Sequence, residues 1–255
     1  MRWGRGLALS ALVLGVVALL GVRTWRAKDR GTVHRGWAVA ESQGCFTCHG
    51  VGGHRGMSDP GHGLEDIPPW SGGLMSMYAE NEAEIREWIQ DGLTKRVRKD
   101  PEQMKLRQGA AIAMPSFRDV LSDADLDALV AYVKAVADFD KPEDAKAEAG
   151  RQIAIQYGCF NCHGPQGRGA LDNPGSLKGY VPSWDGRDFP DLVRNRAEFD
   201  QWVMYGISNR FRENPAAGFF LHRAAVHMPP YLHHAGRGDL DALWAYVTWL
   251  RRTLH

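Results

Sequence analysis

The sequence predicts an all-α protein in which two tandem copies of one domain follow an N-terminal transmembrane helix. Three observations predict this: no long stretch alternates apolar and polar residues as a half-buried strand does, much of the chain repeats after 114 residues, and residues 6–22 form an uncharged, mostly apolar run. The expected divisions are residues 1–30 for the anchor and a short linker, 31–140 for the first domain and 141–255 for the second.

The N-terminal apolar run lies between Arg5 and Arg23, with Trp3 and Trp25 on either side. Its seventeen residues are at the short end for a bilayer-spanning helix, and tryptophan is a common residue at the membrane interface. A signal peptide that is removed after export is the alternative, but no small-residue cleavage site directly follows the run. We therefore expect a retained anchor. Basic residues precede and follow it, so charge does not set its orientation.

The repeat runs without a gap through both copies. Its longest match joins "DLDALVAYV" at 125–133 to "DLDALWAYV" at 239–247. Other identities at this offset include Gly36 with Gly150, Pro68 with Pro182, Trp70 with Trp184, Glu84 with Glu198, Trp88 with Trp202, Gly92 with Gly206, and Arg96 with Arg210. A residue that both copies contain is a stronger site candidate than a residue of one copy.

Helices are expected at three places in each copy. In the first copy they cover about 35–46, 80–92 and 122–137. The middle helix ends at Gly92, a residue type that favours helix C-termini, and the last helix starts at Ser122, with an acidic residue three positions later. The last helix also carries apolar residues at helical spacing, so one of its faces is expected in the core. The remaining segments are expected to be loops.

Two six-residue stretches, "CFTCHG" at 45–50 and "CFNCHG" at 159–164, contain all four cysteines. Each has the C-x-x-C-H spacing of covalent haem attachment, in which the two sulfurs bond the porphyrin and the histidine binds the iron. The predicted attachment residues are Cys45, Cys48 and His49 in the first copy and Cys159, Cys162 and His163 in the second. The sequence therefore predicts two covalently attached haem c groups.

Cysteines at this spacing have three other possible uses: a zinc site, a redox pair and disulfide bonds. A zinc site could use two C-x-x-C pairs, but it would not need a histidine after each pair. A thioredoxin-like redox pair needs a βαβ context, which the sequence does not predict. Disulfides are possible in an exported protein with an even number of cysteines. Haem attachment is the interpretation that also accounts for both histidines.

Each copy resembles a class I cytochrome c in the order of its parts: a helix, C-x-x-C-H, loops, a methionine and a terminal helix. The resemblance covers nearly everything after residue 30. It implies that Gly36 packs against Tyr132, and Gly150 against Tyr246, where the first and last helices of each domain cross. It also implies that haem forms a large part of each small core.

Met114 and Met228 are the expected sixth ligands of the two irons. Each follows its histidine, His49 or His163, by 65 residues, and both are followed by proline, in "AMPSF" and "HMPPY". A thioether ligand raises the reduction potential of haem iron. His227, next to Met228, is the alternative in the second copy, although it has no histidine counterpart in the first.

The resemblance also suggests residues around the ligands. The carbonyl groups of Pro68 and Pro182 would accept a hydrogen bond from the iron-binding histidines, as such histidines usually require. Four further repeated residues are candidates for contacts with the haem propionates: Trp70, Trp184, Arg96 and Arg210. The alternative is that the tryptophans belong to the core and the arginines face solvent.

The expected function is electron transfer without catalysis, because an iron bound by both histidine and methionine has no position left for a substrate. The layout resembles the di-haem subunit of haem–copper oxidases. We therefore expect a subunit or docked carrier of a respiratory or photosynthetic membrane complex. The net charge of +1 does not suggest nucleic-acid binding. The alternative is a di-haem peroxidase-type enzyme with one open iron position.

The expected location is the inner (cytoplasmic) membrane of a bacterium, crossed once. Covalent haem attachment implies that the haem domains lie on the exported, periplasmic side. The partners would be the membrane and the other subunits, or a redox partner protein.

Overall fold

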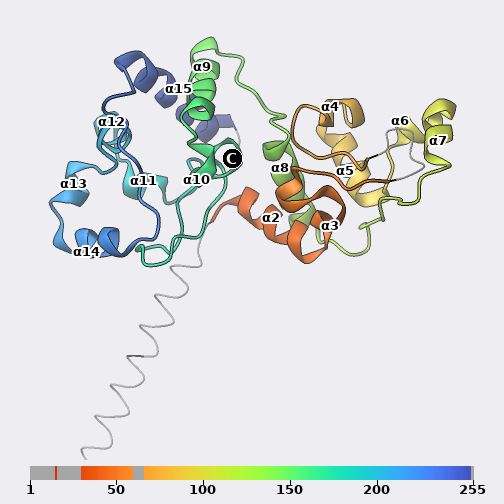
Figure 1. Ribbon diagram of the computed structural model, residues 1–255, viewed down its shortest axis with the longest axis horizontal. Coiled ribbons are helices and arrows are strands. Elements are labelled where there is room, and N and C mark those ends of the chain that lie inside the picture. The colour runs from red at the N-terminus through yellow and green to blue at the C-terminus, as the bar shows by residue number, and fades with distance from the viewer. Residues whose placement is uncertain (1–14, 16–29, 60–65, 254–255) are drawn as a thin grey trace, which may run out of the picture.

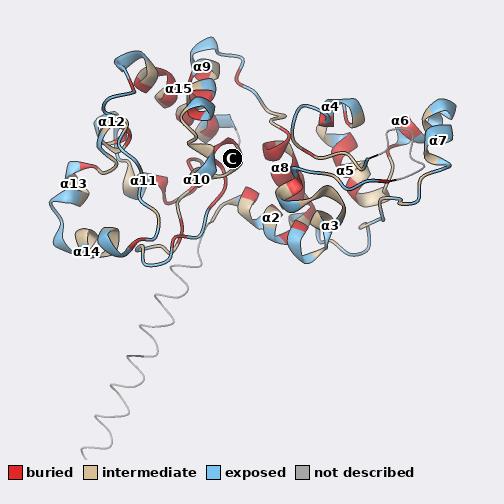
Figure 2. Ribbon diagram, in the orientation of Figure 1, coloured by how far each residue is buried: buried red, intermediate tan, exposed pale blue. Residues whose placement is uncertain are grey.

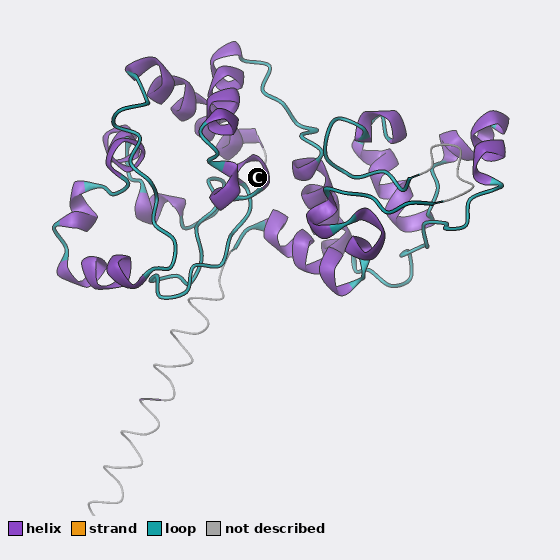
Figure 3. Ribbon diagram, in the orientation of Figure 1, coloured by secondary structure: helices purple, strands orange, loops and turns teal. Residues whose placement is uncertain are grey.

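A computed structural model describes residues 15, 30–59 and 66–253, and its helices form two lobes that follow one another along the chain (Figure 1). In these ranges the regular structure is helical, apart from two isolated antiparallel bridges (Figure 3). The bridges join Ser58 to Asp66 and Asp172 to Tyr180, which are equivalent positions in the two copies. The expectation of an all-α fold built from two copies is therefore confirmed.

The same succession of elements appears in both lobes. The first lobe contains α2 (Thr32–Ser42), α3 (Cys45–His49), η1 (Val51–Gly53), α4 (Met75–Tyr78), α5 (Glu82–Asp91), α6 (Lys95–Lys99), α7 (Pro101–Arg107) and α8 (Asp123–Val136). The second contains α9 (Ala145–Gln156), α10 (Phe160–His163), η2 (Pro165–Gly167), α11 (Phe189–Leu192), α12 (Arg196–Tyr205), α13 (Asn209–Arg212), α14 (Pro215–Arg223) and α15 (Arg237–Thr253).

The middle and last helices of the first lobe agree with the expectations. The Ser122 hydroxyl accepts a hydrogen bond from the third residue of α8, and Gly92 ends α5 in the left-handed conformation, with φ of 68°. The first expected helix, 35–46, was wrong as one element, because the chain turns between α2 and α3 at Gly44, with φ of 75°.

The expectation of loops elsewhere was also wrong between α5 and α8. Both α7 and its equivalent α14 begin with a capping side chain, Asp100 or Asn214, directly before proline. The cap accepts hydrogen bonds from the first free N–H groups, and proline suits the first helical position. The local signals were thus present, but helices this short show too little apolar periodicity to be recognised by it.

The first and last helices of each lobe cross with their backbones in contact. A Cβ atom added to Gly36 would lie 2.0 Å from the carbonyl oxygen of Ala128 and 2.6 Å from the Cβ of Tyr132. At Gly150 the added Cβ would lie 1.9 Å from the carbonyl oxygen of Ala242. Only glycine permits this approach. It lets α8 and α15 bury one face each, as the red segments of these helices show (Figure 2).

Each lobe has its own core. Around α8 it includes Val33, Ile85 and Leu129, and around α15 it includes Phe199, Leu243 and Leu250. The first cysteine and the candidate methionine of each lobe pack against the core of that lobe. The sites proposed from sequence therefore lie in the two separate cores, one in each lobe.

The expected transmembrane segment, 6–22, lies outside the described residues except for Gly15. None of the helices in the described part of the chain is long and apolar enough to cross a membrane.

Replacing Gly150 with alanine should destabilise the second lobe, because the new methyl group meets a backbone carbonyl that cannot rotate away. Overpacking of this kind costs about 1–3 kcal/mol. Gly218, in α14, has no atom within 4 Å of an added Cβ, so Gly218→Ala should be neutral or stabilise by up to about 1 kcal/mol through helix propensity. Denaturant unfolding checks both variants. Equal stability of the two would contradict the tight crossing.

Candidate functional site

The two attachment motifs lie on short helices next to the helix crossing. Cys45, Cys48 and His49 lie within α3. Cys162 and His163 lie in α10, a helix that begins directly after Cys159. All four cysteines are reduced and half-buried. Burial raises the pKa of Cys45, and likewise that of Cys159, to about 11. These two sulfurs are therefore S–H groups near neutral pH. Such a group forms a thioether by adding across a vinyl double bond.

The histidine of each motif is held by a proline carbonyl. His49 Nδ1 lies 2.9 Å from the oxygen of Pro68, and His163 Nδ1 lies 3.0 Å from that of Pro182. A carbonyl oxygen can only accept, so Nδ1 carries the proton and Nε2 has the lone pair that an iron ligand needs. Burial lowers the pKa of both histidines, which keeps the imidazoles neutral.

An aromatic cluster fixes this arrangement. In the first lobe Trp70 is 6% exposed, and its ring lies 4.9 Å from that of His49 and 6.0 Å from that of Tyr132. The Tyr132 hydroxyl donates a hydrogen bond of 3.1 Å to the carbonyl of Gly52, which follows the motif. In the second lobe Trp184 and Tyr246 are placed in the same way, and Tyr246 donates to the carbonyl of Gln166.

Both tryptophans are core residues whose rings also shield a histidine from water. Their burial agrees with the alternative expectation, that the tryptophans belong to the core.

Sequence reasoning missed one pair of glycines that this packing requires. A Cβ on Gly53 would lie 2.2 Å from the Trp70 ring, and a Cβ on Gly167 would lie 2.3 Å from the Trp184 ring. Both glycines also have positive φ, and their carbonyls accept from the backbone N–H groups of the tryptophans at 2.8 Å. The signal was available, since the two glycines repeat at the same 114-residue offset.

The candidate methionines are half-buried and pack against the same cores as the first cysteines. Their loops rest on the glycines that end the middle helices. A Cβ on Gly92 would lie 2.2 Å from the Met114 carbonyl oxygen, and a Cβ on Gly206 would lie 2.3 Å from that of Met228. These glycines therefore stop a helix and also allow the methionine loop to pack close to it.

His227, the alternative ligand, is exposed, and its Nε2 donates a 2.7 Å hydrogen bond to the carbonyl of Leu221. Met228, in contrast, packs against the core. The placement of the two side chains favours the methionine.

The repeated arginines bind glutamates. Arg96 makes two hydrogen bonds to Glu84, at 2.8 and 3.0 Å, and Arg210 makes two to Glu198, at 2.7 and 3.0 Å. Each guanidinium also donates to a backbone carbonyl, that of Tyr78 or that of Leu192. Trp88 and Trp202 donate to the same two carbonyls. These contacts connect the middle helix, α5 or α12, to the short helices before and after it, and they lend no support to a role at the haem propionates.

The residues present fit a covalently bound haem. Each lobe has two reduced thiols about one helical turn apart, a neutral histidine whose Nε2 is the unprotonated nitrogen, and a methionine on the same core. The four cysteines are divided between two cores, which is not the arrangement of a single zinc site with four cysteine ligands. The arrangement can hold one haem in each lobe and surround it with apolar and aromatic side chains.

Two protein-family models match the chain, one in each lobe. Residues 31–133 match the family model described as cytochrome C oxidase, cbb3-type, subunit III, and residues 147–251 match the model of cytochrome c. No curated protein and no solved structure matches the chain.

The Glu198–Arg210 pair should make the stability of the second lobe depend on pH. The hydrogen bonds from Arg210 lower the pKa of Glu198 to about 2, whereas an unfolded chain has a value of about 4.3. The contribution is therefore complete above about pH 4.3 and is lost as the pH falls towards 2. Glu198→Gln should lower stability at neutral pH, and its difference from the parent should shrink in acid.

Unfolding curves between pH 7 and pH 2 measure this difference, with Glu213→Gln, at an exposed position, as the control. A difference between Glu198→Gln and the parent that stays constant over this range would contradict the role of the ion pair.

Replacing Met228 with alanine should remove the methionine-to-iron charge-transfer band of one haem and lower the potential of that haem. The thioether favours ferrous iron, so its loss favours the ferric state. Met204 also packs against the second core but has no methionine counterpart, and Met204→Ala should keep both properties. Absorption spectra and redox titration check this. An unchanged band and potential in Met228→Ala would place the ligand elsewhere, with His227 tested next.

Proposed function

We propose that this chain, a tandem pair of cytochrome c domains, is a membrane-anchored di-haem cytochrome that carries electrons as a subunit or docked carrier of a membrane complex. The observation that carries the proposal is that, in each lobe, a neutral histidine and a methionine pack against the same core. The histidine ring contacts the core tryptophan, and the methionine packs against the core itself. An iron held by both side chains would exchange electrons and would leave no position for a substrate.

When bound, the haem supplies an iron that accepts and releases one electron. The chain does the rest. Pro68 and Pro182 hold the histidines in one tautomer and orientation. Trp70 and Trp184 cover the histidine rings. Packing and hydrogen bonds already fix these groups, so they would need little reorganisation when the charge on a bound iron changed.

A membrane partner is supported by two features. The first domain matches a family described as a subunit of a cbb3-type cytochrome c oxidase, and the apolar run at 6–22 is suited to an anchor. Tethering raises the local concentration of the domains near a membrane complex without adding any contact. We place the chain in the inner membrane of a bacterium with its haem domains in the periplasm, where haem is attached covalently. The complex is respiratory or photosynthetic.

Removing the anchor should separate the two parts of the proposal. Deleting residues 1–26 and supplying a cleavable export signal should leave both domains haem-loaded and soluble, while electron delivery to the membrane complex falls. Respiration or photosynthetic electron flow at equal protein abundance is the measurement. If the soluble form supports it as well as the full chain, the anchored role is wrong. Rapid peroxide turnover with one five-coordinate iron would favour a peroxidase-type enzyme.

A further inference from the structure

Three polar residues form a contact between the two domains; Arg151 and Gln166 are buried, and the side chain of Asp138 is 37% exposed. Asp138 lies just beyond the C-terminal end of α8, Arg151 lies in α9, and Gln166 lies in η2. One carboxylate oxygen of Asp138 accepts from Arg151 Nη1 at 2.5 Å, and the other accepts from Gln166 Nε2 at 3.1 Å. Gln166 Nε2 also donates to the backbone carbonyl of Asp140, at 2.8 Å. We call Asp138, Arg151 and Gln166 the seam.

Burial distinguishes the seam from the Arg30–Asp172 ion pair. Arg151 and Gln166 are each 3% exposed, and Glu148 completes the pairing of Arg151 at 2.6 Å. A buried cation is stable only while its partners stay in place. The Arg30–Asp172 pair joins the segment before α2 to the second domain, but the Asp172 side chain is 71% exposed, and such pairs contribute little. The seam is therefore the stronger constraint on the domain arrangement.

The backbone of the seam is strained at two points. Asp138 and Gln166 have φ of 52° and 55°, and they are the two non-glycine residues with positive φ in the described part of the chain. Such conformations persist where the surrounding contacts enforce them. These two residues hydrogen-bond to each other across the domain boundary.

The two copies differ at all three positions of the seam. The counterpart of Gln166 in the first copy is Gly52, which makes the same turn with φ of 65° and no side chain. The counterpart of Arg151 is Trp37, and that of Asp138 is Arg252. All three seam residues thus differ between the copies, although the residues around the haem sites repeat. These three differences lie where the two domains touch.

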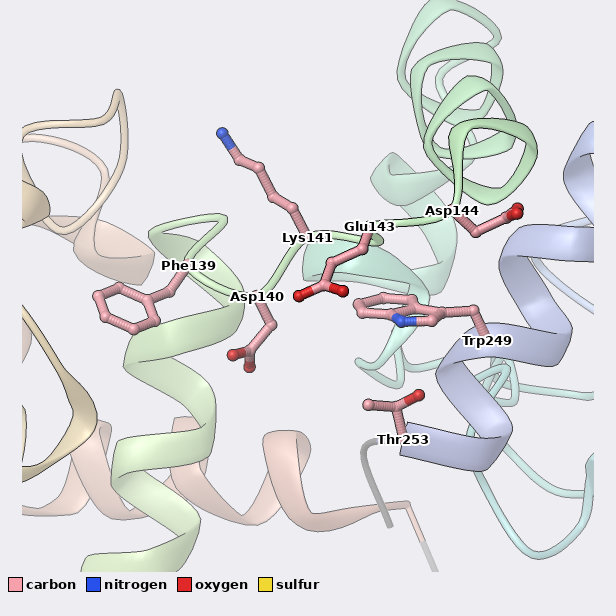
Figure 4. A pocket seen from close by; sticks show the side chains of 7 residues that line it. All are labelled: Phe139, Asp140, Lys141, Glu143, Asp144, Trp249 and Thr253. Atoms are coloured by element: carbon pink, nitrogen blue, oxygen red, sulfur yellow. The ribbon is translucent and has the colours of Figure 1, made fainter.

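The seam connects the segments that follow the two haem motifs. Tyr132, in α8, holds the carbonyl of Gly52 in η1, and Asp138, beyond the end of the same helix, holds Gln166 in η2. Beside the seam an open groove of about 600 Å³ lies between the linker and α15. Asp140 and Lys141 line the linker side of this groove and Trp249 the helix side (Figure 4).

We propose that Asp138, Arg151 and Gln166 are positioning residues that hold the two haem sites at one separation and orientation. The proposal rests on the proposed function, because it concerns electron exchange between two haems. The rate of such exchange falls steeply with separation. The seam side chains would therefore influence the rate of electron exchange between the haems through the separation of the two sites, without themselves accepting or donating an electron.

The test is the double variant Asp138→Gly/Gln166→Gly in the full-length, oxidised protein in detergent. Glycine adopts positive φ without strain, so each domain should stay folded while both side chains of the contact are lost. Pulsed EPR measures the distribution of iron–iron distances. The variant should give a broader distribution than the parent and slower electron equilibration between the haems after flash reduction of one of them.

The control is Gln152→Ala. Gln152 is exposed, and its side chain donates to Glu148, the carboxylate that also pairs with Arg151, and not to Asp138 or Gln166. It should keep the parent distribution and rate. A double variant with the parent distance distribution would overturn the seam proposal while leaving the proposed function intact.

Proteolysis supplies a reading that does not depend on haem. The side chain of Lys146, in the first turn of α9 next to the linker, is 59% exposed, and alanine follows it in the sequence. Trypsin should cleave there faster in the double variant than in the parent or in Gln152→Ala. Equal cleavage rates would also overturn the seam. A parent protein that contains fewer than two haems would instead contradict the proposed function.

Discussion

The close crossing of the first and last helices is the contact on which each domain depends. Gly36 and Gly150 bring two backbones together where any side chain would collide with a carbonyl group. The crossing places Tyr132 and Tyr246, whose hydroxyls hold the segments after the attachment motifs. Those segments seat the tryptophans, and the prolines two residues before the tryptophans orient the histidines. A displacement at the crossing would therefore reach the iron ligand through a short series of packed groups.

Much of this arrangement could be predicted from sequence because the chain carries two copies of it. The repeat selected Gly36, Pro68, Trp70 and Met114 without any other sequence for comparison. The short helices α6 and α7 escaped prediction because one or two turns carry too little apolar periodicity. The partner of Arg96 could not be read from the sequence either. Its contact with Glu84, twelve residues away, forms only after α5 and α6 have folded against each other.

Selecting residues that repeat in both copies does not find the seam. Asp138, Arg151 and Gln166 are replaced by different residues in the other copy, so a search for repeated residues passes over them. Their pairing depends on how one domain lies against the other, and no local pattern encodes that relation. Duplication supplied two equivalent haem domains, and the residues that later diverged include those through which the domains touch. The repeated residues thus determine the structure within each domain, whereas the seam residues, which differ between the copies, form the contact between the domains.

The central claim is that each of the two domains carries one covalently attached haem. Mass spectrometry of the denatured full-length protein tests it most directly, because denaturation removes every group that is not bonded to the chain. The account predicts the mass of the polypeptide plus two haems, and plus one haem when Cys159 and Cys162 are both replaced by alanine. A parent mass with one haem or none would contradict it.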